Sequence, residues 1–154
     1  MTAKVSELIA EIIARCKTLP EFGDRGYSVY DMDDLETTAF NGFPLVAVTY
    51  EGREPVDNSV NGVARGSCSA TVLALRFMVV VGVEYQSISN EDTKPTATDL
   101  LDAIIPVMLG YKGVNNRPWK LVGETPVDGA LEGVIFYGQI WETEIIISGS
   151  FVQN

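Results

Sequence analysis

Two long stretches of the sequence, residues 70–85 and 133–148, are apolar at most positions rather than at every second one. Alternate side chains of a β-strand point to opposite faces of the sheet, so a strand with one face in water alternates apolar and polar residues. The pattern therefore predicts two long strands that are covered on both faces. Either another copy of the chain covers part of the second face, or the N-terminal segment or residues 52–67 fold back over it.

The first of these strands is also long for a domain of this size. At about 3.3 Å per residue, residues 70–85 would span on the order of 50 Å. A compact domain of 154 residues has a diameter of roughly 40 Å. Part of the strand can therefore project beyond the core.

Two other segments carry the apolar spacing of helices that lie on a core. Residues 3–17 and 98–110 place apolar side chains at intervals of three and four positions. Thr96 and Asp99 form a capping-box pair before the second helix, in which Pro106 is expected to cause a kink. Shorter elements complete the prediction: strands at 27–32, 43–52 and 119–125, and a helical turn at 33–40.

The order of these elements predicts the fold class. Runs of strands do not alternate regularly with helices, which favours an α+β fold with a mostly antiparallel sheet. The sheet has long central and C-terminal strands, and the two main helices pack on one face. Residues 1–154 are expected to form a single domain. Residues 52–67 are rich in Gly, Pro, Asn and Ser, which predicts a long loop or an extended hairpin arm.

Composition excludes several kinds of chemistry. The chain has 21 acidic and 11 basic residues and no histidine. The net charge of −10 argues against a large surface that binds phosphates, so no specific nucleic-acid binding is expected. The lack of histidine removes the usual general base and the commonest metal ligand. Cys16 and Cys68 are expected to be free thiols, and the sequence predicts no membrane span and no signal peptide.

Two acidic groups are candidates for a site. Residues 31–36 form the densest acidic cluster but do not match the spacing of a calcium loop. Asp33 and Asp34 are better explained as caps of a short helix. Glu142 and Glu144 would face the same side of a strand, as such pairs often do at solvated strand ends. We therefore assign no catalytic, cofactor-binding or metal-binding residue and predict no enzyme activity.

Residues 110–120 form another candidate, with two glycines and three bases. The segment lacks the Lys-Ser or Lys-Thr ending of a phosphate-binding loop. It is better explained as a surface loop in which Trp119 anchors the following strand. Tyr111, Trp119 and Trp141 are expected to be core or interface anchors.

Several segments in a fixed order carry a resemblance over nearly the whole chain. They are ELIAEIIARCK, FPLVAVTYEG, a long loop, TVLALRFMVVVG, DLLDAIIPVMLG and RPWKLVGETPVDGALEGVIFYGQIWETEI. In this arrangement the chain resembles the tail terminator proteins of contractile-tailed bacteriophages. Residues 52–67 and 86–97 have no clear counterpart in that family.

The resemblance implies a structural virion protein that forms a hexameric ring. The ring would cap the tail tube, stop its polymerisation and join the tail to the head or neck. Implied partners are further copies of the chain, the tail tube protein and a neck or head-tail connector protein, and the sheath is a further candidate. The implied location is the virion tail, and the host cytoplasm during assembly. DNA would pass through the ring without being bound, and no cofactor is implied.

Expected assembly contacts follow from the apolar strands and the segment 52–67. They are Arg53, Val60, Arg65, Arg76, Met78 and Trp141. The wall of the ring is expected to be neutral to acidic, with these acids as candidates for its lining: Asp31, Asp33, Asp34 and Glu36. Two other functions stay open. One is a different neck adaptor or stopper protein, and the other is a monomeric small-ligand domain or carboxylate-dependent enzyme.

Overall fold

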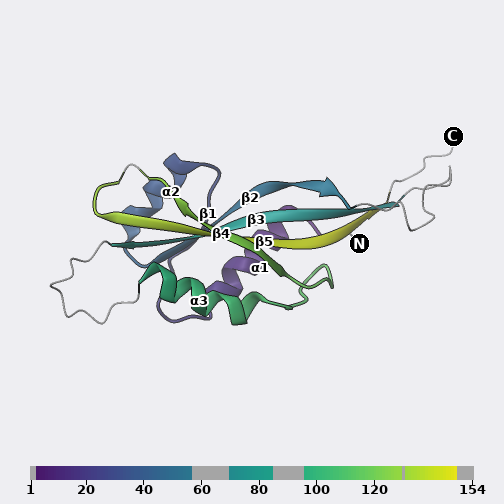
Figure 1. The fold of residues 1–154 in the computed structure, drawn as a ribbon, viewed down its shortest axis with the longest axis horizontal. Coiled ribbons are helices and arrows are strands. Elements are labelled where there is room, and N and C mark those ends of the chain that lie inside the picture. The colour runs from purple at the N-terminus through teal and green to yellow at the C-terminus, as the bar shows by residue number, and fades with distance from the viewer. Residues whose placement is uncertain (1–2, 57–69, 85–95, 130, 149–154) are drawn as a thin grey trace.

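The protein has an α+β fold, as predicted (Figure 1). The structure is a computed structural model that describes residues 3–56, 70–84, 96–129 and 131–148. Within these ranges no helix is both long and apolar enough to cross a membrane. Its elements in chain order are α1 (Val5–Cys16), β1 (Gly26–Ser28), α2 (Met32–Thr38), the 3₁₀ helix η1 (Ala39–Asn41), β2 (Leu45–Pro55), β3 (Ala70–Glu84), α3 (Ala97–Met108), β4 (Lys120–Val127) and β5 (Val134–Ser148).

The five strands form one sheet in the order β1-β2-β3-β5-β4. Every neighbouring pair is antiparallel except β1 and β2, which run parallel. The central strand β3 pairs with β5 along its whole length, from Ala70 opposite Ser148 to Glu84 opposite Val134. The two strands that are apolar on both faces are therefore the two inner neighbours at the middle of the sheet.

Helices α1 and α3 cover one face of the sheet, as predicted. The apolar side chains of both helices pack against the odd-numbered residues of β3. These residues form the main core, where Phe77 is fully buried. The ring of Phe77 packs against Tyr50 on β2 at 5.3 Å and against Trp119 at 5.5 Å between centroids. Burying one such side chain stabilises a fold by about 1.5–3 kcal/mol. This face therefore supplies most of the hydrophobic stabilisation.

The opposite face is covered at one end by α2 of the same chain. Leu35 of α2 is 2% exposed and belongs to a second core with Val80 and Phe136. Gly82 lies under this core, where a Cβ would come within 2.9 Å of the ring of Phe136. At this end the cover is therefore a helix of the same chain, which was not among the expected covers. The short helix has one buried leucine, too few apolar positions to reveal this role in sequence.

Beyond the helices β2, β3 and β5 continue together as a three-stranded arm (Figure 1). The arm begins near Gly52, which has a φ of 120° and lies at a shift in the register between β2 and β3. Residues 52–55 pair with residues 73–76 of β3. The start of the segment 52–67 is therefore a strand of a hairpin arm, and residues 57–69 lie outside the described residues.

The helix caps agree with the sequence in one case and differ in the other. Thr96 Oγ1 accepts the Asp99 N–H at 3.2 Å, and an Asp99 carboxylate oxygen accepts the Thr96 N–H at 3.1 Å. Hydrogen bonds from the backbone and the side chain of Thr96 to the Asp99 carboxylate lower the pKa of Asp99. At α2 the cap is Asp31, which accepts the Asp34 N–H at 2.9 Å. Asp33 and Asp34 lie in the first turn instead, so the predicted caps were wrong by two to three positions.

Cys16 is a free thiol with no exposed surface, as expected. Burial raises its pKa to about 12, so the thiol stays protonated near neutral pH. Cys68 lies outside the described residues. Cys16 therefore acts as a small apolar side chain of the core.

The packing of α2 on the second face gives a first prediction. Replacing Leu35 by Ala should lower the free energy of unfolding by about 2–5 kcal/mol, because it leaves a cavity over Val80 and Phe136. Urea denaturation followed by circular dichroism measures this change. Thr37→Ala on the exposed side of α2 is the matched control and should stay within about 0.5 kcal/mol. An equally small effect of Leu35→Ala would mean that α2 does not cover this face.

Candidate functional site

The predicted contact residues that the structure describes lie on β2, β3 and β5 but differ in exposure. Arg53 and Arg76 are exposed, and Met78 is half-buried. Trp141 has no exposed surface, and its Nε1–H donates to Gln139 Oε1 at 2.8 Å. The structure thus corrects the expectation for Trp141, which lies in the core of its own chain. The other two expected contacts lie outside the described residues: Val60 and Arg65.

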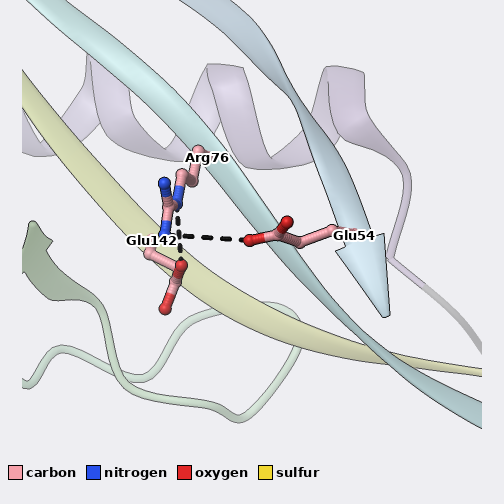
Figure 2. A network of polar contacts seen from close by, with 3 residues as sticks. All are labelled: Glu54, Arg76 and Glu142. Atoms are coloured by element: carbon pink, nitrogen blue, oxygen red, sulfur yellow. Dashed lines mark hydrogen bonds and ion pairs between the residues drawn. The ribbon is translucent and has the colours of Figure 1, made fainter. Parts of the chain in front are cut away.

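Arg76 lies at the centre of a polar network on the arm (Figure 2). Its Nε–H donates to Glu142 Oε1 on β5 at 3.0 Å, and its Nη2 lies 3.8 Å from Glu54 Oε1 on β2. The hydrogen bond to Glu142 is the largest cause of the raised pKa of Arg76. The pair adds little to stability because water screens exposed charges. The charge of Arg76 is therefore balanced within the chain, and Glu142 takes part in this network rather than in a pair with Glu144.

An apolar groove opens at the edge of the sheet, where β1 ends. It consists of two hollows of about 580 Å³ and about 260 Å³ on either side of β2. The two hollows share four lining residues: Val29, Tyr30, Thr49 and Tyr50. The larger hollow also contacts α1, through Val5, Ile9 and Ile13, and the smaller one contacts α2 and Met78. We call this surface the edge groove.

The edge groove exists because β1 is short. Its pairing with β2 ends at Ser28 opposite Val48, followed by one hydrogen bond from the Val29 N–H to the Val48 carbonyl at 3.0 Å. None of the described residues pairs with the outer edge of β2 from Thr49 to Pro55. Apolar side chains on both sides of this edge are consequently left in contact with solvent.

The rim of the edge groove carries an aromatic ring and acids. The side chain of Tyr30 is 89% exposed. Asp31 and Glu51 line the smaller hollow, and Asp33 is exposed in the first turn of α2 next to it. Among the described residues no group of three or more His, Cys, Asp or Glu side chains is placed to hold a metal ion. The acids therefore form a negative rim on an apolar groove.

A second surface with exposed apolar residues lies at the opposite edge of the sheet, in residues 109–120. Leu109 and Val114 are 58% and 52% exposed. Three of the 11 basic residues of the chain lie here and are exposed: Lys112, Arg117 and Lys120. None of the ion pairs between described residues involves them. We call this surface the basic loop.

Four hydrogen bonds fix the basic loop to the fold, three of them half-buried and one exposed. The Glu11 carboxylate on α1 accepts the Val114 N–H at 2.8 Å and the Trp119 Nε1–H at 3.0 Å. The Asn115 side-chain amide donates to Thr143 Oγ1 and to the Glu144 carbonyl, both at 2.8 Å. Trp119 has no exposed surface, which confirms that it anchors the loop and the following strand.

Two glycines allow this close fit. Gly110 has a φ of 75° just after α3, a conformation that favours glycine. A Cβ at Gly113 would collide with the Glu11 carboxylate. The loop therefore keeps one shape, in which Val114 points outward with Lys112 and Arg117 on either side in sequence.

Sequence reasoning found the basic loop but missed the edge groove. The three bases and two glycines of the loop are adjacent in sequence, so they could be recognised as a surface loop. Tyr30 and Thr49 come together only because β1 lies parallel beside β2 and then ends. No local pattern shows where a short edge strand stops, so only the structure places these residues.

The hydrogen bonds of Glu11 give a second prediction. Glu11→Ala should lower the free energy of unfolding by about 1–3 kcal/mol, because the buried Trp119 Nε1–H and the Val114 N–H lose their acceptor. Glu11→Gln keeps one acceptor oxygen and should cost less. Urea denaturation measures both. Glu7→Ala on the exposed side of α1 is the control and should cost at most about 1 kcal/mol. Equal effects at both positions would contradict the bracing role of Glu11.

No protein-family model matches the sequence, and no curated protein matches it either. Any function assigned to this chain therefore depends on its residues and its geometry.

Proposed function

We propose that this chain is a structural subunit of a ring that caps a bacteriophage tail tube, stops its polymerisation and joins the tail to the head or neck. One observation carries the proposal: two different surfaces with exposed apolar residues, the edge groove and the basic loop, lie at opposite edges of one sheet. Contacts between two different surfaces are heterologous, and they generate a closed ring when the rotation closes.

The element order supports the same proposal. The chain runs from a helix through short and long strands to a second helix and two more strands, in the order on which the resemblance to tail terminator proteins depends. The projecting arm of β2, β3 and β5 provides a surface that reaches beyond the helices (Figure 1). Arg53 is exposed on that arm and is suited to a charge-assisted bond with a tube or neighbouring subunit.

One alternative of a different class is favoured by a specific observation. The larger hollow of the edge groove, about 580 Å³ and mostly apolar, has the size of many small-molecule sites. A monomeric binder of a small apolar ligand would use the groove without a second copy. A neck adaptor or stopper protein would instead share the ring and differ in the partner it contacts.

The tube-capping role gives a third prediction. When the chain is added to growing tubes of the tail tube protein from the same phage, negative-stain electron microscopy should show a ring at one tube end. Tube growth from that end should stop, because the ring covers the surface to which the next tube subunit would bind. The tube protein alone is the control. Unchanged tube growth with no rings at the ends would contradict the proposal, and rings bound only to neck protein would favour the adaptor.

The passage of DNA gives a fourth prediction. The assembled protein should bind duplex DNA weakly, and its affinity should depend little on salt concentration. The reason is that a channel that neutralised many phosphates would hold the genome through counterion release. The net charge of −10 is consistent with a channel that does not. Fluorescence anisotropy with labelled DNA at several salt concentrations tests this. Tight binding that weakens steeply with salt would indicate a ring that retains DNA.

A further inference from the structure

We propose that the basic loop of one subunit docks into the edge groove of the next, so that these two surfaces form the contact that closes the ring. This inference rests on the proposed function and names its self-contact. The occupant of the groove is thus a second copy of the same chain.

Both surfaces present apolar side chains to the solvent. The loop presents Leu109 and Val114, both more than half exposed. The groove presents Val5, Ile9 and Ile13 of α1 together with the ring of Tyr50. Docking would remove all of these side chains from water, which is favourable by roughly 25 cal/mol for each Å² of apolar surface buried.

The charges of the two surfaces are opposite. Lys112 and Arg117 lie on either side of Val114 in sequence. Glu51 lines the smaller hollow of the groove, and Asp33 is exposed in the first turn of α2, the helix that this hollow contacts. On a chain with a net charge of −10, most surfaces of two copies repel each other. A loop with three exposed bases and no ion pair to a described residue is therefore well suited to approach an acidic rim.

The position of the two surfaces makes the contact heterologous. The groove lies at the β1–β2 edge of the sheet, and the loop is bonded to β5 near the other edge. Helix α1 lies between them, since Ile9 faces the groove while Glu11 holds the loop. A chain consequently cannot fill its own groove with its own loop. In a closed ring the basic loop of each subunit fills the edge groove of one neighbour, and its own groove holds the loop of the other neighbour.

The loop is also ready to bind without further ordering. Glu11, Asn115 and the buried Trp119 hold it in one conformation. A preorganised segment loses less conformational entropy on docking, so more of the contact energy appears as affinity.

Reversing the charges on each surface tests the proposed contact, and mixing the two reversed variants should rescue assembly. The base-reversed variant carries Lys112→Glu and Arg117→Glu, and the acid-reversed variant carries Asp33→Lys and Glu51→Lys. These four side chains are exposed and form no helix cap, and Asp31 keeps the cap of α2. Each variant alone opposes like charges across the contact, which should raise the concentration for half-assembly about tenfold or more. Analytical ultracentrifugation at low salt measures this concentration.

The equimolar mixture of the two variants is the decisive sample. When the two variants alternate, every second contact joins a reversed loop to a reversed groove, and the others join an unchanged loop to an unchanged groove. Opposite charges therefore meet at every contact, and the mixture should assemble close to the wild-type concentration. Lys17→Glu and the double change Glu21→Lys with Asp24→Lys alter charge elsewhere on exposed residues and should leave assembly unchanged. Circular dichroism shows that each variant is folded. Wild-type assembly by both reversed variants, or a mixture that does not recover, would overturn the contact.

A cross-link detects the contact even when it is weak. In a background with Cys68→Ser, chains with Val114→Cys mixed with chains with Ala10→Cys should form a disulfide-linked dimer under mild oxidation. Ala10 lines the groove, and Asp24→Cys in its place is the control. Dimer formation no greater than that of the control would overturn the contact. If the rings pass these tests but do not cap tubes, the contact stands and the tube-capping function fails. If variants that fail these tests still cap tubes, the tube-capping function stands and the contact fails.

Discussion

The central strand β3 is apolar on both faces, and the other elements lie where they cover one face or the other. Burying only one face of such a strand would leave a row of apolar side chains in water. Helices α1 and α3 cover the face that contains Phe77. The short helix α2 covers the other face at the end that contains Val80. Towards the arm no described helix covers the second face, which carries the charged network of Arg76 instead (Figure 2).

Helix α1 connects this core to both candidate surfaces. Its buried side chains Leu8, Ile12 and Cys16 belong to the main core. Ile9 and Ile13 form one wall of the edge groove, while Glu11 holds the basic loop. One twelve-residue helix therefore sets the position of two surfaces relative to each other. For a subunit that assembles head to tail, that relative position would determine the angle between neighbouring copies.

The distribution of charge is as informative as its sum. Asp31 and Asp34 accept backbone hydrogen bonds at the start of α2, and two glutamates balance the charge of Arg76. Lys112, Arg117 and Lys120 are exposed and have no ion pair with a described residue. A strongly acidic chain with one local basic surface can recognise the acidic surface of its own copies, because opposite charges steer association and like charges disfavour other arrangements.

The periodicity of the chain by itself determined the α+β fold, both main helices, the two long strands and the Thr96–Asp99 capping box. These features depend on residues a few positions apart, so spacing along the chain is enough to reveal them. The anchoring of the loop by Trp119 was also predictable, because a large aromatic ring beside a strand is rarely left in water. Only the tertiary structure decided that Trp141 is a core residue, that α2 covers the second face and that Tyr30 meets Thr49 at a groove. Each of these depends on which distant segments pair and where a short edge strand ends, and local spacing does not contain that information.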